Sequence, residues 1–321
     1  MIRCKLLVCL LALFLVKITG SPVGAQTTQV VSYRQLVHLK LPHLSGVAWK
    51  PDGTQLAIVS YPSILLWDTA SQKLTTLVAD AKVSGITWSP DGSKIAAVQG
   101  GEDESLFIWN ASTGSLLRRV TRVEPYKAYL YQAAWSPDGQ KIASDGTGRY
   151  ILIWDLSGDE KVYPLEGNSG RFGIPYWNSD SRQVASSGGD GIHIWNLATA
   201  QHTIIIPHLG IDDWNSMETK ILASGENGEA YVWDLTTDRP LLRFDHGASV
   251  LSARWNFNAC LVATAGVDGT IKIWNAESGE LLTAIQQTST LITALAWHPS
   301  RNLLATTSYD DDFIIWQFDI G

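Results

Sequence analysis

The sequence predicts an all-β fold built from seven similar units, and the tryptophans are the first evidence for it. All 14 tryptophans fall into two interleaved series of seven. The first series is Trp49, Trp88, Trp135, Trp177, Trp214, Trp255 and Trp297, and the second is Trp67, Trp109, Trp154, Trp195, Trp233, Trp274 and Trp316. Neighbours in the second series are 38 to 45 residues apart. A fixed period of this length indicates an array of repeated structural units.

An apolar pair recurs in the same register as the tryptophans. Seven or eight residues after each tryptophan of the first series, an aliphatic residue precedes an alanine. The pairs are Leu56-Ala57, Ile95-Ala96, Ile142-Ala143, Val184-Ala185, Leu222-Ala223, Val262-Ala263 and Leu304-Ala305. An alanine in a middle strand is small enough to let a neighbouring sheet approach closely. The pairs therefore predict sheets stacked face to face.

Each unit also contains four segments of strand length. In the sixth unit, residues 261–275 hold two of them, joined by the tight turn Asp268-Gly269. Other segments are separated by the Ser-Pro-Asp-Gly turn at 89–92 and by Thr113-Gly114. Four strands in about 40 residues are typical of a propeller blade. The sequence therefore predicts a seven-bladed β-propeller of four-stranded antiparallel blades.

The two ends of the repeat array are expected to meet in the last blade. After Trp316 only five residues remain, which leaves no room for a fourth strand. Residues 33–39 have strand length and precede the first unit, so we expect them to complete the last blade. Such closure removes the exposed edges of an open array. The predicted organisation is a signal peptide at 1–25, a short polar linker at 26–32 and one propeller at 33–321.

The second tryptophan of most units is followed by Asp or Asn. Trp67, Trp154 and Trp233 precede Asp, and Trp109, Trp195 and Trp274 precede Asn. With the sevenfold period, these dipeptides resemble WD40 repeats over residues 33–321. The resemblance implies a hydrogen-bonded tetrad in each blade. Only the sixth unit matches it at every position, with His246, Thr264, Asp268 and Trp274.

The same resemblance implies that proteins or peptides dock on a rim of loops, those before the first strand and after the second strand of each blade. The candidate partner-binding residues on that rim are Tyr61, Tyr126, Tyr129, Arg149, Arg171 and Tyr309. The longest connection, between Trp109 and Trp135, brings tyrosines close to basic residues, a combination favoured at binding hot spots. Packing of some of these tyrosines beneath the loop is the alternative.

The first 25 residues have the pattern of a secretory signal peptide. Arg3 and Lys5 precede eleven apolar residues at 6–16, and Val23 and Ala25 are placed for cleavage after Ala25. We therefore expect a secreted or periplasmic protein. An uncleaved anchor is the alternative, but eleven residues are too few to span a ~30 Å hydrocarbon core. A scaffold that stays in the cytosol would keep Met1 instead.

The charge balance argues against nucleic acid and membrane surfaces as partners. The chain has 24 Lys and Arg against 31 Asp and Glu. Removal of the leader would take away three basic residues and no acid, which leaves 21 − 31 = −10. Nucleic acids and anionic lipid surfaces attract basic proteins. We expect neither as a partner, and no stable membrane span.

No catalytic, metal-binding or cofactor-binding motif is evident. The sequence contains no Gly-x-Ser-x-Gly elbow, no Gly-rich phosphate loop and no Cys or His pair with metal-ligand spacing. The predicted function is therefore a non-catalytic scaffold for a protein or peptide, without cofactor or metal. The alternative is an enzyme or small-ligand binder at the central channel that uses Asp212 and Asp213. Convergence of these acids with Arg254 in one water-filled pocket would favour that alternative.

Overall fold

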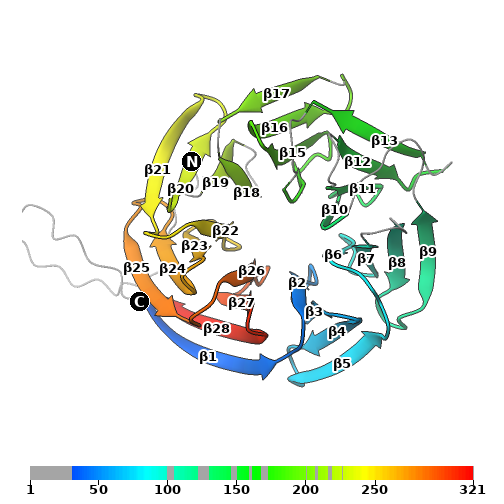
Figure 1. The fold of residues 1–321 in the computed structure, drawn as a ribbon, viewed down its shortest axis with the longest axis horizontal. Coiled ribbons are helices and arrows are strands. Elements are labelled where there is room, and N and C mark those ends of the chain that lie inside the picture. The colour runs from blue at the N-terminus through cyan, green and yellow to red at the C-terminus, as the bar shows by residue number, and fades with distance from the viewer. Residues whose placement is uncertain are drawn as a thin grey trace, which may run out of the picture.

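The computed structural model describes residues 31–99, 105–121, 130–145, 150–158, 161–167, 173–199, 201–206, 209–215, 219–225 and 227–320. Within these ranges the chain forms seven antiparallel four-stranded sheets, arranged as blades around a central axis (Figure 1). The predicted fold class is confirmed. No helix within these ranges is long and apolar enough to cross a membrane.

The first strand of each blade lies innermost and the fourth outermost (Figure 1). Blade one consists of β2 (Leu44–Trp49), β3 (Gln55–Ser60), β4 (Ser63–Asp68) and β5 (Lys73–Val78). Blade two consists of β6 (Ile86–Trp88), β7 (Lys94–Gln99), β8 (Ser105–Asn110) and β9 (Leu116–Thr121). Blade three consists of β10 (Ala133–Trp135), β11 (Lys141–Ser144), β12 (Tyr150–Asp155) and β13 (Lys161–Glu166). Blade four consists of β14 (Tyr176–Trp177), β15 (Gln183–Gly188), β16 (Gly191–Asn196) and β17 (His202–Ile205).

The remaining blades repeat this order, with one exception in the last. Blade five consists of β18 (Gly210–Trp214), β19 (Lys220–Ser224), β20 (Glu229–Asp234) and β21 (Arg239–Asp245). Blade six consists of β22 (Val250–Trp255), β23 (Leu261–Gly266), β24 (Thr270–Asn275) and β25 (Leu281–Gln286). Blade seven consists of β26 (Ile292–Trp297), β27 (Leu303–Ser308), β28 (Asp312–Ile320) and, from the other end of the array, β1 (Val31–Lys40).

Strand β1 closes the ring, as the sequence predicts. It pairs antiparallel with β28 from Val31 opposite Ile320 to Lys40 opposite Asp312, with a bulge between Gln35 and Val37. The strand begins two residues before the predicted segment 33–39, so Val31 and Ser32 belong to the sheet rather than to a linker. The pairing supplies the fourth strand that the C-terminal unit lacks.

The repeated alanines lie where one blade packs on the next. All seven are fully buried, and so are their aliphatic neighbours: Leu56, Ala57, Ile95, Ala96, Ile142, Ala143, Val184, Ala185, Leu222, Ala223, Val262, Ala263, Leu304 and Ala305. Removal of this apolar surface from water is worth about 25 cal/mol per Å². Burial of these pairs, with polar turns between the strands, therefore favours sheets that stack face to face.

Four tryptophans of the first series join their blade to the one before it. In four blades the indole N–H donates to the backbone carbonyl that precedes the equivalent tryptophan of the previous blade. These bonds are Trp49 to Ala296 at 3.0 Å, Trp88 to Ala48 at 2.9 Å, Trp177 to Ala134 at 3.0 Å and Trp297 to Arg254 at 3.2 Å. The repeat in sequence thus becomes a repeat of contacts around the axis.

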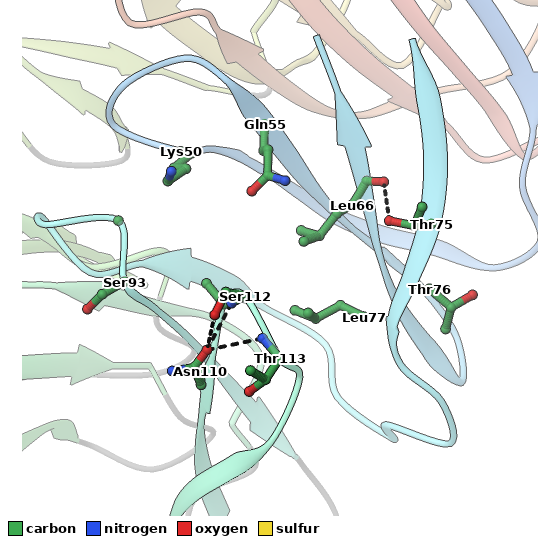
Figure 2. Close-up of a pocket in the computed structure, with 12 residues that line it drawn as sticks. Lys50, Gln55, Leu66, Thr75, Thr76, Leu77, Ser93, Asn110, Ser112 and Thr113 are labelled. Carbon is green, nitrogen blue, oxygen red and sulfur yellow. Dashed lines mark hydrogen bonds between the residues drawn. The ribbon is translucent and has the colours of Figure 1, made fainter. Parts of the chain in front are cut away.

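Blades one and two leave a cavity of about 570 Å³ between them (Figure 2). Its lining comes from β4 and β5, from the residues that flank the turn after β2, and from the turns that join β6 to β7 and β8 to β9. Successive turns of an antiparallel meander alternate between the two ends of the strands. The cavity therefore opens on the face of the ring opposite the turns between the second and third strands.

Candidate interaction face

Three neighbouring blades each expose one large apolar side chain at the same turn. Tyr61, Val267 and Tyr309 directly follow the second strand of blades one, six and seven. They are 45%, 44% and 74% exposed. Because blades six, seven and one are adjacent in the ring, the three residues form an arc at one end of the propeller. We call the surface made by these three residues the loop face.

The backbone at each of these positions is held by the same hydrogen bond. The N–H of the exposed residue donates to the carbonyl of the residue just before the first strand of its own blade. The bonds are Tyr61 to His43 at 3.2 Å, Val267 to Ser249 at 3.0 Å and Tyr309 to Leu291 at 3.0 Å. A surface that is ordered before binding loses less conformational entropy when a partner docks.

The six residues predicted on the rim divide into two groups. Tyr61 and Tyr309 lie on the loop face, whereas Tyr126, Tyr129, Arg149 and Arg171 lie outside the described residues. Sequence reasoning missed Val267. The signal for it was the repeat itself, because Val267 stands four residues after the alanine of its unit, as Tyr61 and Tyr309 do.

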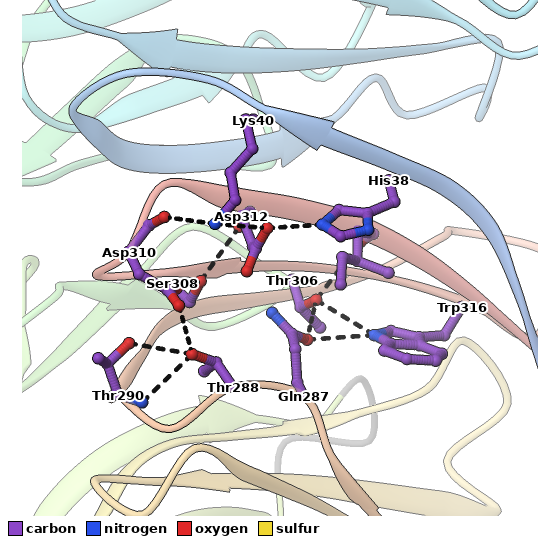
Figure 3. Close-up of polar contacts among 11 residues, drawn as sticks. His38, Lys40, Gln287, Thr288, Thr290, Thr306, Ser308, Asp310, Asp312 and Trp316 are labelled. Atoms are coloured by element: carbon purple, nitrogen blue, oxygen red, sulfur yellow. Dashed lines mark hydrogen bonds and ion pairs between the residues drawn. The ribbon is translucent and has the colours of Figure 1, made fainter.

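Polar contacts in blade seven support the turn that carries Tyr309 (Figure 3). The Ser308 hydroxyl donates to one carboxylate oxygen of Asp310 at 2.5 Å, and the Thr288 hydroxyl donates to the other at 2.6 Å. These two hydrogen bonds lower the pKa of Asp310. Asp311 accepts a hydrogen bond from the backbone N–H of His43 at 2.8 Å. The turns of blades seven and one are thereby tied together.

In blade six, the four residues of the implied tetrad lie close together. The Trp274 indole donates to the Thr264 hydroxyl at 2.8 Å, and His246 Nδ1 lies 2.7 Å from the same oxygen. His246 Nε2 lies 3.5 Å from an Asp268 carboxylate oxygen. Burial lowers the pKa of His246, which favours the neutral ring. Because Asp268 directly follows Val267, this cluster stabilises the turn that carries Val267.

Blade seven builds a similar network without a histidine (Figure 3). The side-chain oxygen of Gln287 accepts hydrogen bonds from the Thr306 hydroxyl at 2.6 Å and from the Trp316 indole at 3.2 Å. The Trp316 indole also lies 3.3 Å from the Thr306 hydroxyl. Gln287 thus supplies the acceptor that a histidine supplies in blade six. The tetrad pattern in the sequence does not include glutamine and therefore missed it.

The acidic pair of blade five is engaged in contacts to its neighbouring blades. Asp212 accepts hydrogen bonds from the Ser224 hydroxyl and, at 3.0 Å, from the Ala253 N–H, while Asp213 accepts from the Trp255 N–H at 3.0 Å. The Arg254 guanidinium lies 4.0 Å from Asp212. Burial raises the pKa of Asp212 to about 6.

The two acids converge with Arg254, and this acid–arginine cluster joins neighbouring blades. The cavity between blades one and two contains none of its residues. Arg254 also stacks over the Tyr176 ring of blade four at 5.5 Å, so the cluster spans three blades. Among the described residues, no group of three His, Cys, Asp or Glu side chains could hold a metal ion.

Two family models match parts of the chain. The model described as the anaphase-promoting complex subunit 4 WD40 domain matches residues 227–300, and the model described as WD domain, G-beta repeat, matches residues 71–110. Both models describe WD40 domains, and the seven four-stranded blades have the architecture that this similarity implies.

Solved structures share this fold over nearly the whole chain. A chain of the "Crystal Structure of Mitotic Checkpoint Complex" aligns with a TM-score of 0.78 and 19% identity, covering 97% of this chain and 99% of that chain. The β-propeller domain of Myceliophteria thermophila Cps50 (Swd1) aligns with a TM-score of 0.77 and 15% identity, covering 89% and 99%. At these identities the likeness shows the fold alone.

Curated relatives resemble about two thirds of the chain. The Arabidopsis thaliana protein "Cell division cycle 20.5, cofactor of APC complex" is 27% identical over 236 residues, which are 67% of this chain and 51% of that protein. The Dictyostelium discoideum anaphase-promoting complex subunit cdc20 is 26% identical, over 67% and 45%. The Schizosaccharomyces pombe WD repeat-containing protein slp1 is 28% identical, over 67% and 46%. The chain spans about half the length of these relatives.

The predicted secreted or periplasmic location is wrong on this comparison. The relatives are cofactors and subunits of the anaphase-promoting complex with a role in the cell division cycle, which points to an intracellular rather than an exported protein. The prediction was based on the apolar run at residues 6–16, which follows two basic residues. This pattern alone does not show that an export system recognises the segment. The predicted leader and its cut after Ala25 lie outside the described residues.

Proposed function

We propose that this protein is a non-catalytic scaffold that binds a protein or peptide partner through its loop face, within a larger assembly. The observation that carries the proposal is the arc of Tyr61, Val267 and Tyr309, which repeats one exposed apolar position on three adjacent blades. Exposed apolar groups that lie together on a rigid frame are typical of interaction sites. The relatives named as cofactors of the anaphase-promoting complex support a role in a multi-subunit assembly.

The charge around the arc suggests the chemistry of the partner. Asp268 directly follows Val267, and Asp310 and Asp311 directly follow Tyr309. Apolar anchors bordered by carboxylates favour a segment that carries aliphatic or aromatic side chains next to a basic residue. Tyrosine suits such a contact, because its rigid ring offers a large area at a low cost in conformational entropy.

The non-catalytic part of the proposal rests on the acids nearest the channel. The carboxylates of Asp212 and Asp213 already accept hydrogen bonds from backbone N–H groups of β22. A general acid or base must be free to reach the proton that it transfers. Both carboxylates are instead used to hold blade six against blade five.

The test is affinity capture with a triple variant of the loop face. Tagged wild-type protein and the variant Tyr61→Ser, Val267→Ser, Tyr309→Ser are used as baits in an extract of the cells that make the protein. The control variant is Leu116→Ser, Leu241→Ser, Leu281→Ser, which alters residues of similar exposure on the outer strands β9, β21 and β25. Recovered proteins are quantified by mass spectrometry.

We expect the loop-face variant to lose its partners by about tenfold or more, since loss of hot-spot side chains typically costs about 2 kcal/mol or more. The control variant should retain them. Equal recovery of every partner by wild type and the loop-face variant would reject this face as the binding site. If both variants lost their partners, the cause would be the added serine hydroxyls on the surface in general and not the loop face.

A further inference from the structure

At the cavity between blades one and two, blade one has a shorter side chain than the leucine at the equivalent position of blade five. In blade five, Leu242 pairs with Val232, the residue before the second tryptophan. Leu242 and Ala276 of the next blade pack in one apolar cluster, and a Cβ on Gly279 would lie 3.5 Å from Leu242. Leu242 therefore fills the gap between its blade and the next turn.

Thr75 takes the place of Leu242 in blade one. It pairs with Leu66, which again is the residue before the second tryptophan. Ala111 takes the place of Ala276 in the facing turn. Threonine is shorter than leucine, and both Thr75 and Ala111 line the cavity of about 570 Å³.

Lys50 opens the cavity from the other side. At this position, the residue after the first tryptophan, other blades carry a side chain that caps its own turn. In blade two, for example, Ser89 accepts the Lys94 N–H at 2.9 Å. In blade six, Asn256 accepts the Leu261 N–H at 3.0 Å. Lys50 instead extends over Gly92 of blade two, where an added Cβ would lie 2.8 Å from its Cε.

The cavity has an apolar floor and a polar, neutral rim (Figure 2). Leu66 and Ala111 are buried and Leu77 is half-buried, so together they offer an apolar surface. Lys50 is the one cation among the described residues of the lining, and Asp52 neutralises it at 2.8 Å. A neutral rim selects against charged ligands, since burial of an unpaired charge is costly.

Two amide side chains on the rim have unused hydrogen-bonding capacity. The Asn110 oxygen accepts from the backbone N–H groups of Ser112 and Thr113 at 3.0 and 3.1 Å, which leaves its NH₂ group available. Within the described part of the chain, neither this NH₂ group nor the Gln55 amide has a hydrogen-bond partner. An amide offers a donor and an acceptor side by side, which is the complement of a peptide group.

We propose that this cavity binds an extended, uncharged peptide segment, with one aliphatic side chain on the floor of Leu66, Leu77 and Ala111 and with its backbone amides bonded to Asn110 and Gln55. The volume lies within the range of known ligand sites, about 300–1,000 Å³. The site is on the face opposite the loop face, and it is independent of the function proposed above. A single protein could thus hold two segments at once.

The test uses N-acetyl-leucine N-methylamide, which has one aliphatic side chain between two peptide groups, as the probe. Its binding is followed by backbone amide chemical shifts of the full chain. We expect a Kd on the order of 1 mM, as befits so small a ligand, with shifts confined to residues 50–55, 75–77 and 110–113. The charged probes N-acetyl-aspartate N-methylamide and N-acetyl-lysine N-methylamide should bind at least about tenfold more weakly.

Two variants and one control decide whether the cavity is the site. Thr75→Leu copies blade five and should fill the cavity and abolish the shifts. Asn110→Asp keeps the oxygen that caps the turn, as Asp68 does in blade one, but removes the NH₂ donor, and should weaken binding about tenfold. Asn196→Asp makes the same change in the equivalent turn of blade four and should leave the affinity unchanged.

Shifts that persist in Thr75→Leu, or that spread over both faces of the ring, would overturn the proposal. Equal binding of the neutral and charged probes would overturn it as well. Each variant is first shown to unfold at the same urea concentration as wild type. A loss of probe binding then cannot be attributed to unfolding of the variant. None of these outcomes bears on the loop face, because its test uses different residues.

Discussion

Asp145 shows how strongly one buried side chain can affect this fold. It follows β11 in blade three, is 3% exposed, and accepts hydrogen bonds from the backbone N–H groups of Tyr131 and Gln132 at 2.9 and 2.6 Å. Burial raises the pKa of its carboxyl to about 7, although the two hydrogen bonds oppose the shift. Asp145 thus holds the backbone just before β10, and its burial lowers the stability of the folded state by an amount that depends on pH.

The expected pH dependence follows from the two states of the chain. In the unfolded chain the carboxyl ionises above about pH 4, whereas in the folded chain it ionises only above about pH 7. Between these values only the folded state keeps the proton, so a rise in pH favours unfolding. We expect wild type to lose up to roughly 4 kcal/mol relative to Asp145→Asn between pH 4 and pH 8.

Urea unfolding of both proteins at pH 5, 6, 7 and 8 checks this expectation. The informative quantity is the difference in unfolding free energy between them, since other titrating groups contribute equally to both. The amide introduced by Asp145→Asn keeps an acceptor oxygen for the two N–H groups. Parallel pH profiles of wild type and variant would show that the carboxyl is not perturbed by burial.

At the scale of the element, strand β1 decides whether the ring is closed. Its ion pairs add little, because His38 and Lys40, which lie 2.6 and 3.0 Å from Asp312, are 44% and 62% exposed. Ion pairs at such exposure contribute about 0–1 kcal/mol. The backbone ladder between β1 and β28, together with buried Val31 and the core-packed Val37 and Leu39, must therefore supply most of the stabilisation.

Removal of β1 is expected to be far more damaging than loss of its ion pairs. A chain that begins at Leu41 exposes the edge of β28, so we expect it to aggregate and to unfold roughly 10 °C or more below wild type. A chain that begins at Val31 is the matched control and should behave as wild type. Size-exclusion chromatography and thermal unfolding measure both effects.

The variant Asp312→Asn separates the charge from the strand. It removes both ion pairs and leaves the ladder intact, and its melting temperature should change by no more than about 2 °C. A larger change would show that His38 and Lys40, rather than backbone pairing, hold the closing strand.

At the scale of the whole molecule, the blades are joined by two kinds of contact near the axis. Indole N–H groups reach the carbonyls of the previous blade, and the acid–arginine cluster joins blades four, five and six. Asp212 is 7% exposed, and the positive charge of Arg254 acts on it directly. Loss of a cation from such a cluster leaves buried negative charge without compensation.

We expect Arg254→Met to destabilise the protein by about 3–5 kcal/mol. The triple variant Arg254→Met, Asp212→Asn, Asp213→Asn should recover a large part of this loss, because it removes the uncompensated charges as well. Urea unfolding measures the three proteins at one pH. If the triple variant is no more stable than the single variant, the carboxylates do not cause the loss.

Much of the fold could be predicted because each blade is specified by a local pattern. Trp274 and the pair Val262-Ala263 lie within one hairpin, and a pair recurs 11 to 14 residues before the second tryptophan of every unit. The candidate site was less predictable. Tyr61 and Tyr309 were found from their place in the repeat, but four of the six predicted rim residues lie outside the described ranges, and Val267 was overlooked because a valine is an ordinary residue in such a chain.

By itself, the sequence determined the number of blades and the order of their strands, because these follow from spacings within about 40 residues. It also indicated the segment that closes the ring, because the last unit lacks a fourth strand. Only the tertiary structure decided which groups meet across blades. Trp49 bonds to a carbonyl 247 residues away, Gln287 replaces a histidine, and Thr75 lines a cavity at the position where blade five has Leu242. Such contacts depend on the approach of sheets far apart in the chain, which no local pattern records.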